Sequence, residues 1–160
     1  MVREFERAEK HPSLGCRTGV HSAGGLIRPS ILMPVPSRAI WSLPLPRGGR
    51  FRSFLAVSSS DNGAAVQFRF GVSDLRIYEA LAQQTITAGR SAWVDFGADL
   101  SAYAGTKFSL FYRPDSMIWR VVLATDALGA SSATAVWGSP EIVTDLAAAK
   151  EYAARRQRLR

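Results

Sequence analysis

The chain has 160 residues, 47% of them hydrophobic and 21% charged, with a formal net charge of +7 at pH 7. This composition is that of one globular domain with a sizeable core, and it excludes a disordered chain. No apolar run approaches the roughly 18–20 residues of a membrane-spanning helix. Residues 1–10 alternate charges and lack the apolar centre of a secretory signal. The sequence therefore predicts no membrane span and leaves the compartment open.

The positive charge comes almost entirely from arginine, and no basic cluster alternates with aromatic residues as in a nucleic-acid module. We therefore expect no nucleic-acid partner. Cys16 is the only cysteine, which excludes an intrachain disulfide. His11, Cys16 and His21 lie close together but lack a zinc-type spacing and a fourth ligand, so no metal site is predicted.

The first 25 residues are expected to form an N-terminal extension. Residues 2–10 have the spacing of one or two helical turns, and residues 11–25 are rich in Gly and Ser and read as a loop. The main domain is then residues 26–143, followed by a basic linker helix at residues 144–160. Asp145 can cap that helix, and the alanine-rich sequence after it favours helix.

From residue 26 onward, short apolar segments between Gly/Ser/Asp loops predict β-strands. The predicted strands are residues 26–33, 37–43, 50–58, 65–73, 118–125 and 133–143. Pro29 interrupts the first strand, which suits an edge strand or an extended entry into the sheet, and Gly138 and Pro140 bend the last one. Two strands alternate clearly. Their inward positions are Phe51, Ser53, Leu55 and Val57, and then Val66, Phe68, Phe70 and Val72.

Residues 76–84 fit two interpretations. Ile77, Ala80 and Leu81 have helical spacing, and the composition favours helix. The segment nevertheless follows a strand after a two-residue break and leads into Thr and Ile residues, so we prefer a strand.

Residues 91–113 form the most specific motif, a strand, a helical turn and a second strand at residues 107–112. Asp99 can accept a hydrogen bond from the N–H of Ser101 and start the turn. Leu100 and Tyr103 lie three residues apart, so both can close the end of a core. Gly105 then stops the turn. The eight to ten strands together predict an all-β fold, an antiparallel sandwich or jelly roll with a C-terminal helix.

The motif VDFGADLSAYAGTKFSLFYR, followed by AVWGSPEI, resembles the galactose-binding-like β-sandwich of carbohydrate-binding modules. The resemblance covers residues 26–143 and implies a jelly roll of two antiparallel sheets. Such domains are appended to exported bacterial glycosidases and sulfatases, which implies an extracellular or cell-envelope location and an adjacent catalytic domain. In some members, loops at one end bind sugars. Ser139 departs from the pattern, since many relatives have Asp there. A structural calcium ion is compatible with the family, but no calcium-ligand pattern transfers to this chain, so no cofactor is predicted.

The chain contains no GxSxG elbow, P-loop, HExxH or CxxC, which favours a non-catalytic module. A carboxylate-dependent hydrolase or lyase is the enzymatic alternative. Its candidates, all near strand ends and all better explained as capping or loop residues, are Asp95, Asp99, Asp115 and Asp126.

Sugar binding needs an aromatic face and planar polar groups in a preformed site. The candidate ligand-binding residues are Tyr112, Arg113, Asp115 and Trp119, in and beside one loop. A core position is the alternative for Trp119, and it is what we expect of the remaining tryptophans, Trp41, Trp93 and Trp137. The predicted function is weak carbohydrate binding through loops at one end of the sandwich. The rival is a structural or protein-interaction domain that packs against a neighbouring catalytic domain.

Overall fold

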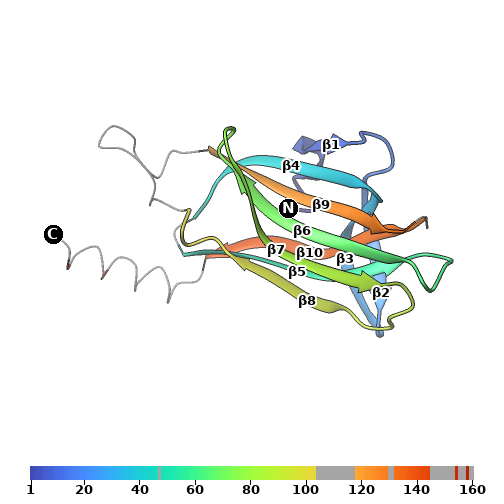
Figure 1. The fold of residues 1–160 in the computed structure, drawn as a ribbon. Helices are drawn as coiled ribbons and strands as arrows, with labels where there is room; N and C mark the ends of the chain where they lie inside the picture. Colours follow the sequence, from blue (N-terminus) through green and yellow to red (C-terminus); the bar gives the residue numbers. More distant parts are fainter. Residues whose placement is uncertain (47, 104–117, 130–131, 145–153, 155–157, 159–160) are drawn as a thin grey trace.

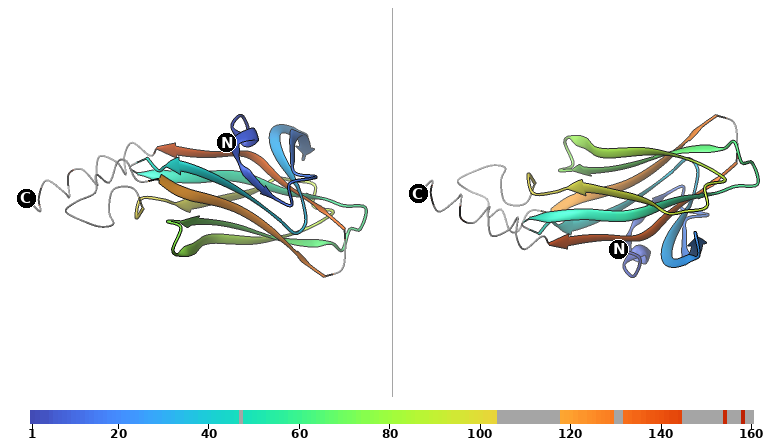
Figure 2. Two further views of the ribbon diagram at one scale, coloured as in Figure 1. Left: turned by 90° about the horizontal axis from the view of Figure 1, so that it is seen from above. Right: turned by 90° about the horizontal axis from the view of Figure 1, so that it is seen from below.

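The computed structural model describes residues 1–46, 48–103, 118–129 and 132–144, together with Ala154 and Arg158. Ten strands form two antiparallel five-stranded sheets, which stack as two layers (Figures 1 and 2). The predicted strand at residues 107–112 lies outside the described residues, as does the predicted C-terminal helix apart from Ala154 and Arg158. Among the described residues, no helix is long and apolar enough to cross a membrane.

We call the two layers sheet A and sheet B. Sheet A has the order β1 (Glu9–His11), β4 (Ser37–Pro44), β9 (Ile118–Leu128), β6 (Ala65–Ser73) and β7 (Tyr78–Thr87). Sheet B has the order β2 (Arg17–Ala23), β3 (Leu26–Pro34), β10 (Thr134–Thr144), β5 (Gly49–Ser58) and β8 (Val94–Asp99). Strands β3 to β10 divide four and four between the sheets in the jelly-roll arrangement. The predicted antiparallel β-sandwich is confirmed.

Aromatic rings from both sheets fill the core around Trp137, which is fully buried. Phe51 of sheet B stacks on Phe70 of sheet A, with ring centroids 4.0 Å apart. Trp137 meets Phe68 and Phe96 edge-on, at centroid distances of 5.0 and 5.7 Å. Three of these rings belong to the alternating strands β5 and β6, whose inward residues were predicted correctly because each strand has one buried face.

The N-terminal residues depart from the prediction. The expected loop at residues 11–25 contains β2, which pairs with β3 along all seven of its residues. β2 lies at the edge of sheet B and most of its side chains are exposed, so its sequence shows no alternation. In place of helical turns over residues 2–10, the chain forms a short 3-10 turn, η1 (Phe5–Arg7), and then β1. β3 lies between β2 and β10, but its pairing with β10 starts at Ser30, just after Pro29, so only its first residues have the expected edge character.

Two further predictions are confirmed. The ambiguous segment at residues 76–84 falls largely in the strand β7. The last strand is irregular where a bend was expected, because the register of β10 with β5 shifts between Gly138 and Glu141. Ser139 within this bulge has a φ of 46°, in the left-handed region that favours glycine.

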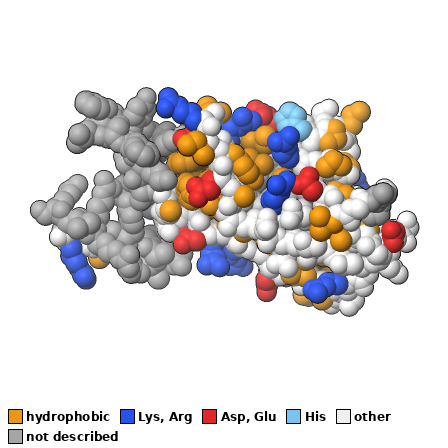
Figure 3. Space-filling view, in the orientation of Figure 1, with side chains coloured by type: hydrophobic (Ala, Val, Ile, Leu, Met, Phe, Trp, Pro, Cys, Tyr) orange, Lys and Arg blue, Asp and Glu red, His pale blue; other side chains and the backbone are white. Residues whose placement is uncertain are grey.

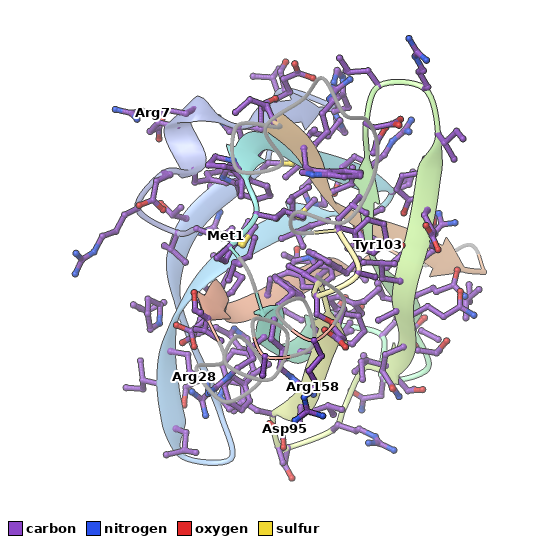
Figure 4. All side chains as sticks on the ribbon, turned by 90° about the vertical axis from the view of Figure 1, so that its left-hand side faces the viewer. Met1, Arg7, Arg28, Asp95, Tyr103 and Arg158 are labelled. Atoms are coloured by element: carbon purple, nitrogen blue, oxygen red, sulfur yellow. The ribbon has the colours of Figure 1, made fainter. Side chains whose placement is uncertain are left out.

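The corner after β8 closes one end of the core. The carboxylate of Asp99 accepts a hydrogen bond of 2.9 Å from the Ser101 N–H, as predicted. Leu100 is fully buried, and Tyr103 lies between the sheets at this end (Figure 4). Burial, aided by a hydrogen bond with Glu79, raises the pKa of Tyr103 to about 12. The rest of the motif, including Gly105, lies outside the described residues.

Trp93 is not a core residue, contrary to expectation. Its half-buried ring covers a small apolar cluster on the outer face of sheet B that contains Leu32, Ala56 and Val136. The indole Nε1–H donates a hydrogen bond of 2.9 Å to the carbonyl oxygen of Leu26. The ring lies outside the sandwich because residue 93 shares the outward parity of Asp95, whereas Phe96 and Ala98 face the core.

Candidate ligand-binding site

The predicted loop site is only partly covered by the structure. Tyr112, Arg113 and Asp115 lie outside the described residues. Trp119 is buried in β9, and its ring meets that of Tyr103 edge-on with centroids 5.4 Å apart. This position favours the core alternative for Trp119, since a buried ring offers no face to a sugar.

The outer face of sheet A carries two adjoining hollows, of about 460 and 290 Å³. Both are lined by Arg38, Ala124 and Arg69, so together they form one shallow trough. The larger hollow adds His11, Pro36, Ser37 and Asp126, and the smaller one adds Ile40, Ser73, Tyr78, Arg120 and Val122. Figure 3 shows this face, where basic, acidic and apolar side chains lie close together.

The strand register explains why these residues converge. Arg38 of β4 is the Cα partner of Ala124 of β9, which is the partner of Arg69 of β6. Residues two apart along a strand share a face, so Val122 continues the floor between the neighbouring strands. The outward residues of β9 from position 120 to position 126 cover roughly 20 Å along the strand. The hollow forms because the small side chains of Val122 and Ala124 on β9 lie between long side chains on β4 and β6.

Tyr78 forms one side of the trough because of Gly71. A Cβ added at Gly71 would lie only 2.5 Å from the Cε2 and hydroxyl oxygen of Tyr78. The ring therefore occupies the place above β6 that a side chain at position 71 would take. Tyr78 remains 46% exposed, so an aromatic surface is available to a ligand. Burial raises the pKa of Tyr78, against the opposing effect of Arg69 and Arg38, so its hydroxyl stays protonated near neutral pH.

Two of the three arginines in the trough have carboxylate partners. Arg69 forms an ion pair with Asp126, and Arg120 donates a hydrogen bond of 2.5 Å to Glu9. The Arg38 guanidinium has no ion pair or hydrogen bond with any described residue. The Nε–H of Arg69 is buried without an acceptor among the described residues. The trough is therefore rich in hydrogen-bond donors.

Metal-ligand clusters and the predicted carboxylates also bear on the chemistry of the trough. No three His, Cys, Asp or Glu side chains among the described residues could hold a metal ion. The carboxylates proposed for the enzymatic alternative are separated by the fold, since Asp126 lies on sheet A whereas Asp95 and Asp99 lie on β8 of sheet B. Asp126 therefore cannot act on one substrate together with Asp95 or Asp99, and Asp115 lies outside the described residues.

Sequence reasoning missed this trough. The outward position of Arg69 follows from the alternation of β6, but the neighbours that make it part of a site come from β4, β7 and β9. The available signal was Gly71 inside the alternating strand β6, because an isolated strand glycine often marks a close approach by another group.

The outer face of sheet B has a separate aromatic and basic cluster. The Arg28 guanidinium lies 3.5 Å from the ring centroid of Phe54, and the His21 ring meets Trp93 edge-on. Burial lowers the pKa of His21. Arg28 and Asp95 both lie on this side of the molecule (Figure 4). Both histidines thus belong to the sheets, whereas the sequence predicted them outside the folded region: His11 is in β1 and His21 is in β2.

No protein-family model and no curated protein sequence matches this chain. Solved structures do resemble it. The TmCBM61 structure in complex with beta-1,4-galactotriose has 10% identity and a TM-score of 0.49, over 88% of this chain and 90% of that one. The K3 adhesin domain of Lys-gingipain from Porphyromonas gingivalis has 12% identity and a TM-score of 0.48, over 88% and 96%. The CBM22-1–GH10 modules of Clostridium thermocellum xylanase 10B, complexed with xylohexaose, have 12% identity and a TM-score of 0.47, over 88% and 26%. None of these similarities assigns a ligand to this chain.

Proposed function

We propose that this chain is a non-catalytic module that binds a glycan in the trough on the outer face of sheet A. The observation that carries the proposal is the Tyr78 ring, which lies across Gly71 beside Arg38 and Arg69. An exposed aromatic surface can contact the apolar side of a sugar ring, and planar guanidinium groups can hydrogen-bond its hydroxyls. The apolar floor of Ile40, Val122 and Ala124 completes a site of the mixed character that sugars need.

The site is supported by rigid elements rather than by loops. All of its residues except Pro36 come from β1, β4, β6, β7 and β9, whose backbones are fixed by the ladder of sheet A. A preformed site loses little conformational entropy on binding. The trough is nonetheless shallow and open, which supports the weak affinity expected from the sequence. Tyr112, Arg113 and Asp115 remain proposed as additional ligand-binding residues, and attachment to a catalytic domain outside the cell remains proposed from the family resemblance.

A glycan microarray followed by calorimetric titration of the best-binding oligosaccharide tests this function. Tyr78→Ala should weaken binding about five- to tenfold or more, because it removes the aromatic surface. Ile77→Ala is the matched control, since Ile77 is the neighbouring residue, is 71% exposed and lies outside the trough. Equal affinity in the Tyr78→Ala variant and the unmodified protein would remove the sheet A trough from consideration.

A protein-docking function is the second candidate, because apolar side chains are exposed at one end of the sandwich. Leu75, Ile77 and Ile118 have exposed fractions of 76%, 71% and 55%. Leu75 also has a φ of 79°, an unfavourable conformation for a bulky residue. The absence of detectable binding on a microarray of plant, microbial and host glycans would favour this candidate over glycan binding.

A further inference from the structure

We propose that the trough selects anionic glycans and that Arg38 receives the negative group of the ligand. This inference rests on the proposed function and specifies its ligand class. Arg38 and Tyr78 line the same hollow, so a sugar ring on Tyr78 would bring a ring substituent towards Arg38. The carboxylate of a uronic acid and a sulfate ester each present a pair of oxygen atoms. A guanidinium can donate two parallel hydrogen bonds to such a pair.

The balance of charge in the trough supports an anionic ligand. Arg69 and Arg120 are each compensated by a carboxylate, Asp126 and Glu9 respectively. Arg38 lies on β4, between β1 and β9, and no described carboxylate forms an ion pair with its guanidinium. Covering this uncompensated guanidinium with a neutral ligand would desolvate a charge without providing a counter-charge.

The hydrogen-bonding inventory points the same way. A guanidinium offers five N–H donors and no acceptor. The carboxylates of Asp126 and Glu9 already accept hydrogen bonds from arginines, and the remaining side-chain hydroxyls of the smaller hollow are those of Ser73 and Tyr78. The hydroxyls of a neutral sugar bring donors as well as acceptors, whereas an ionised carboxylate or sulfate only accepts, so an anionic glycan fits this excess of donors better.

Calorimetric titration can separate this inference from the proposed function itself. The probes are a galacturonic acid oligomer, a neutral galactose oligomer of equal length and its sulfated form, each measured at low salt and at about 0.5 M NaCl. We expect the galacturonic acid oligomer to bind at least tenfold more tightly than the neutral one at low salt. Added salt should reduce this difference through screening. A sulfated oligomer that binds best would support anionic selection and identify a sulfate ester as the source of the charge.

Variants of two arginines show where the selection arises. Arg38→Ala should lower the ratio of the affinities for the acidic and neutral oligomers at least tenfold. Arg38→Lys should retain part of this preference because the charge remains. Arg52→Ala is the control, since Arg52 lies on β5 of sheet B, has a side chain that is 54% exposed and approaches Glu141 at 3.7 Å. Thermal unfolding of each variant verifies that it is folded.

Four outcomes would contradict the proposals. Equal binding of neutral and acidic oligomers overturns anionic selection but leaves the glycan-binding function in place. Equal losses in the Arg38→Ala and Arg52→Ala variants would indicate general attraction to the net charge of +7, which also overturns it. A preference that survives in Arg38→Ala removes Arg38 from the site. If none of the three oligomers binds and the microarray shows no binding, the proposed function as a whole is contradicted.

Discussion

Replacing Gly71 by alanine should separate ligand binding from stability. The new Cβ would lie 2.5 Å from two atoms of Tyr78, the Cε2 and the hydroxyl oxygen. Carbon atoms in favourable contact are about 3.5–4.0 Å apart, so the ring must move by about 1 Å or more. The movement is outward, because the buried backbone of β6 lies on the other side and the ring is 46% exposed.

The cost to folding should be small. Lifting a half-buried ring from the sheet loses on the order of 1 kcal/mol of apolar burial. Replacing glycine by alanine restricts the unfolded chain and returns about 0.4–1 kcal/mol, because Gly71 is not among the residues with positive φ. The free energy of unfolding should therefore change by less than about 1 kcal/mol, which corresponds to about 2–4 °C in Tm for a domain of this size. Glycan affinity should fall about five- to tenfold, as the aromatic surface is displaced.

Calorimetry and thermal unfolding of four proteins complete the test: the unmodified protein, Gly71→Ala, Tyr78→Ala and the double variant. If Gly71 acts on binding only through the position of Tyr78, the double variant should bind like Tyr78→Ala alone. Unchanged affinity in Gly71→Ala, with Tyr78→Ala clearly weakened, would refute this positioning role. A fall in Tm of more than about 10 °C would refute the claim that the ring can move outward at low cost.

Three further predictions concern the framework that supports the trough. Phe51→Ala should lower the free energy of unfolding by about 3–5 kcal/mol, measured by urea titration, because Phe51 is fully buried and stacks on Phe70; a loss below about 1 kcal/mol would contradict its central position. Ser53→Ala should cost about 1–3 kcal/mol in the same assay, because it leaves the carbonyl of Gly138 without the buried hydroxyl that donates to it at 3.0 Å; Ser53→Thr is its partner variant. Hydrogen bonds from Ser101 lower the pKa of Asp99, so its contribution to stability is present above the unfolded-state pKa of about 3.9 and is lost as the pH falls through the folded-state pKa. Asp99→Asn should therefore flatten the decline of Tm below about pH 4, and an identical decline in both proteins would be evidence against this role.

The sequence predicts the parts of this fold in which each strand carries its own pattern. β6 places Val66, Phe68, Phe70 and Val72 on one buried face, and that alternation can be read without knowing the partner strands. The corner after β8 is likewise local, since Asp99 and Ser101 are two residues apart. Local hydrogen bonds and short-range periodicity leave a direct trace in the sequence.

Features that depend on distant strands were not predicted. β2 has no alternating pattern, because its place at the sheet edge leaves most of its side chains exposed; only its pairing with β3 makes it a strand. The trough depends on register: Arg38 and Arg69 are far apart in the chain and become near neighbours only because each pairs with Ala124. Tyr78 belongs to the site because its ring crosses the strand at Gly71, and no spacing along the chain encodes that approach.

The most direct test of the account is a map of the glycan contact surface by NMR. A uniformly ¹⁵N-labelled sample is titrated with the glycan that binds best on the microarray, and the shift of every backbone amide is followed. The account predicts that the largest shifts cluster on the outer face of sheet A, around Arg38, Arg69, Gly71, Tyr78 and Val122. Largest shifts on β5 and β8 of sheet B, or at residues 112–115 alone, would contradict it.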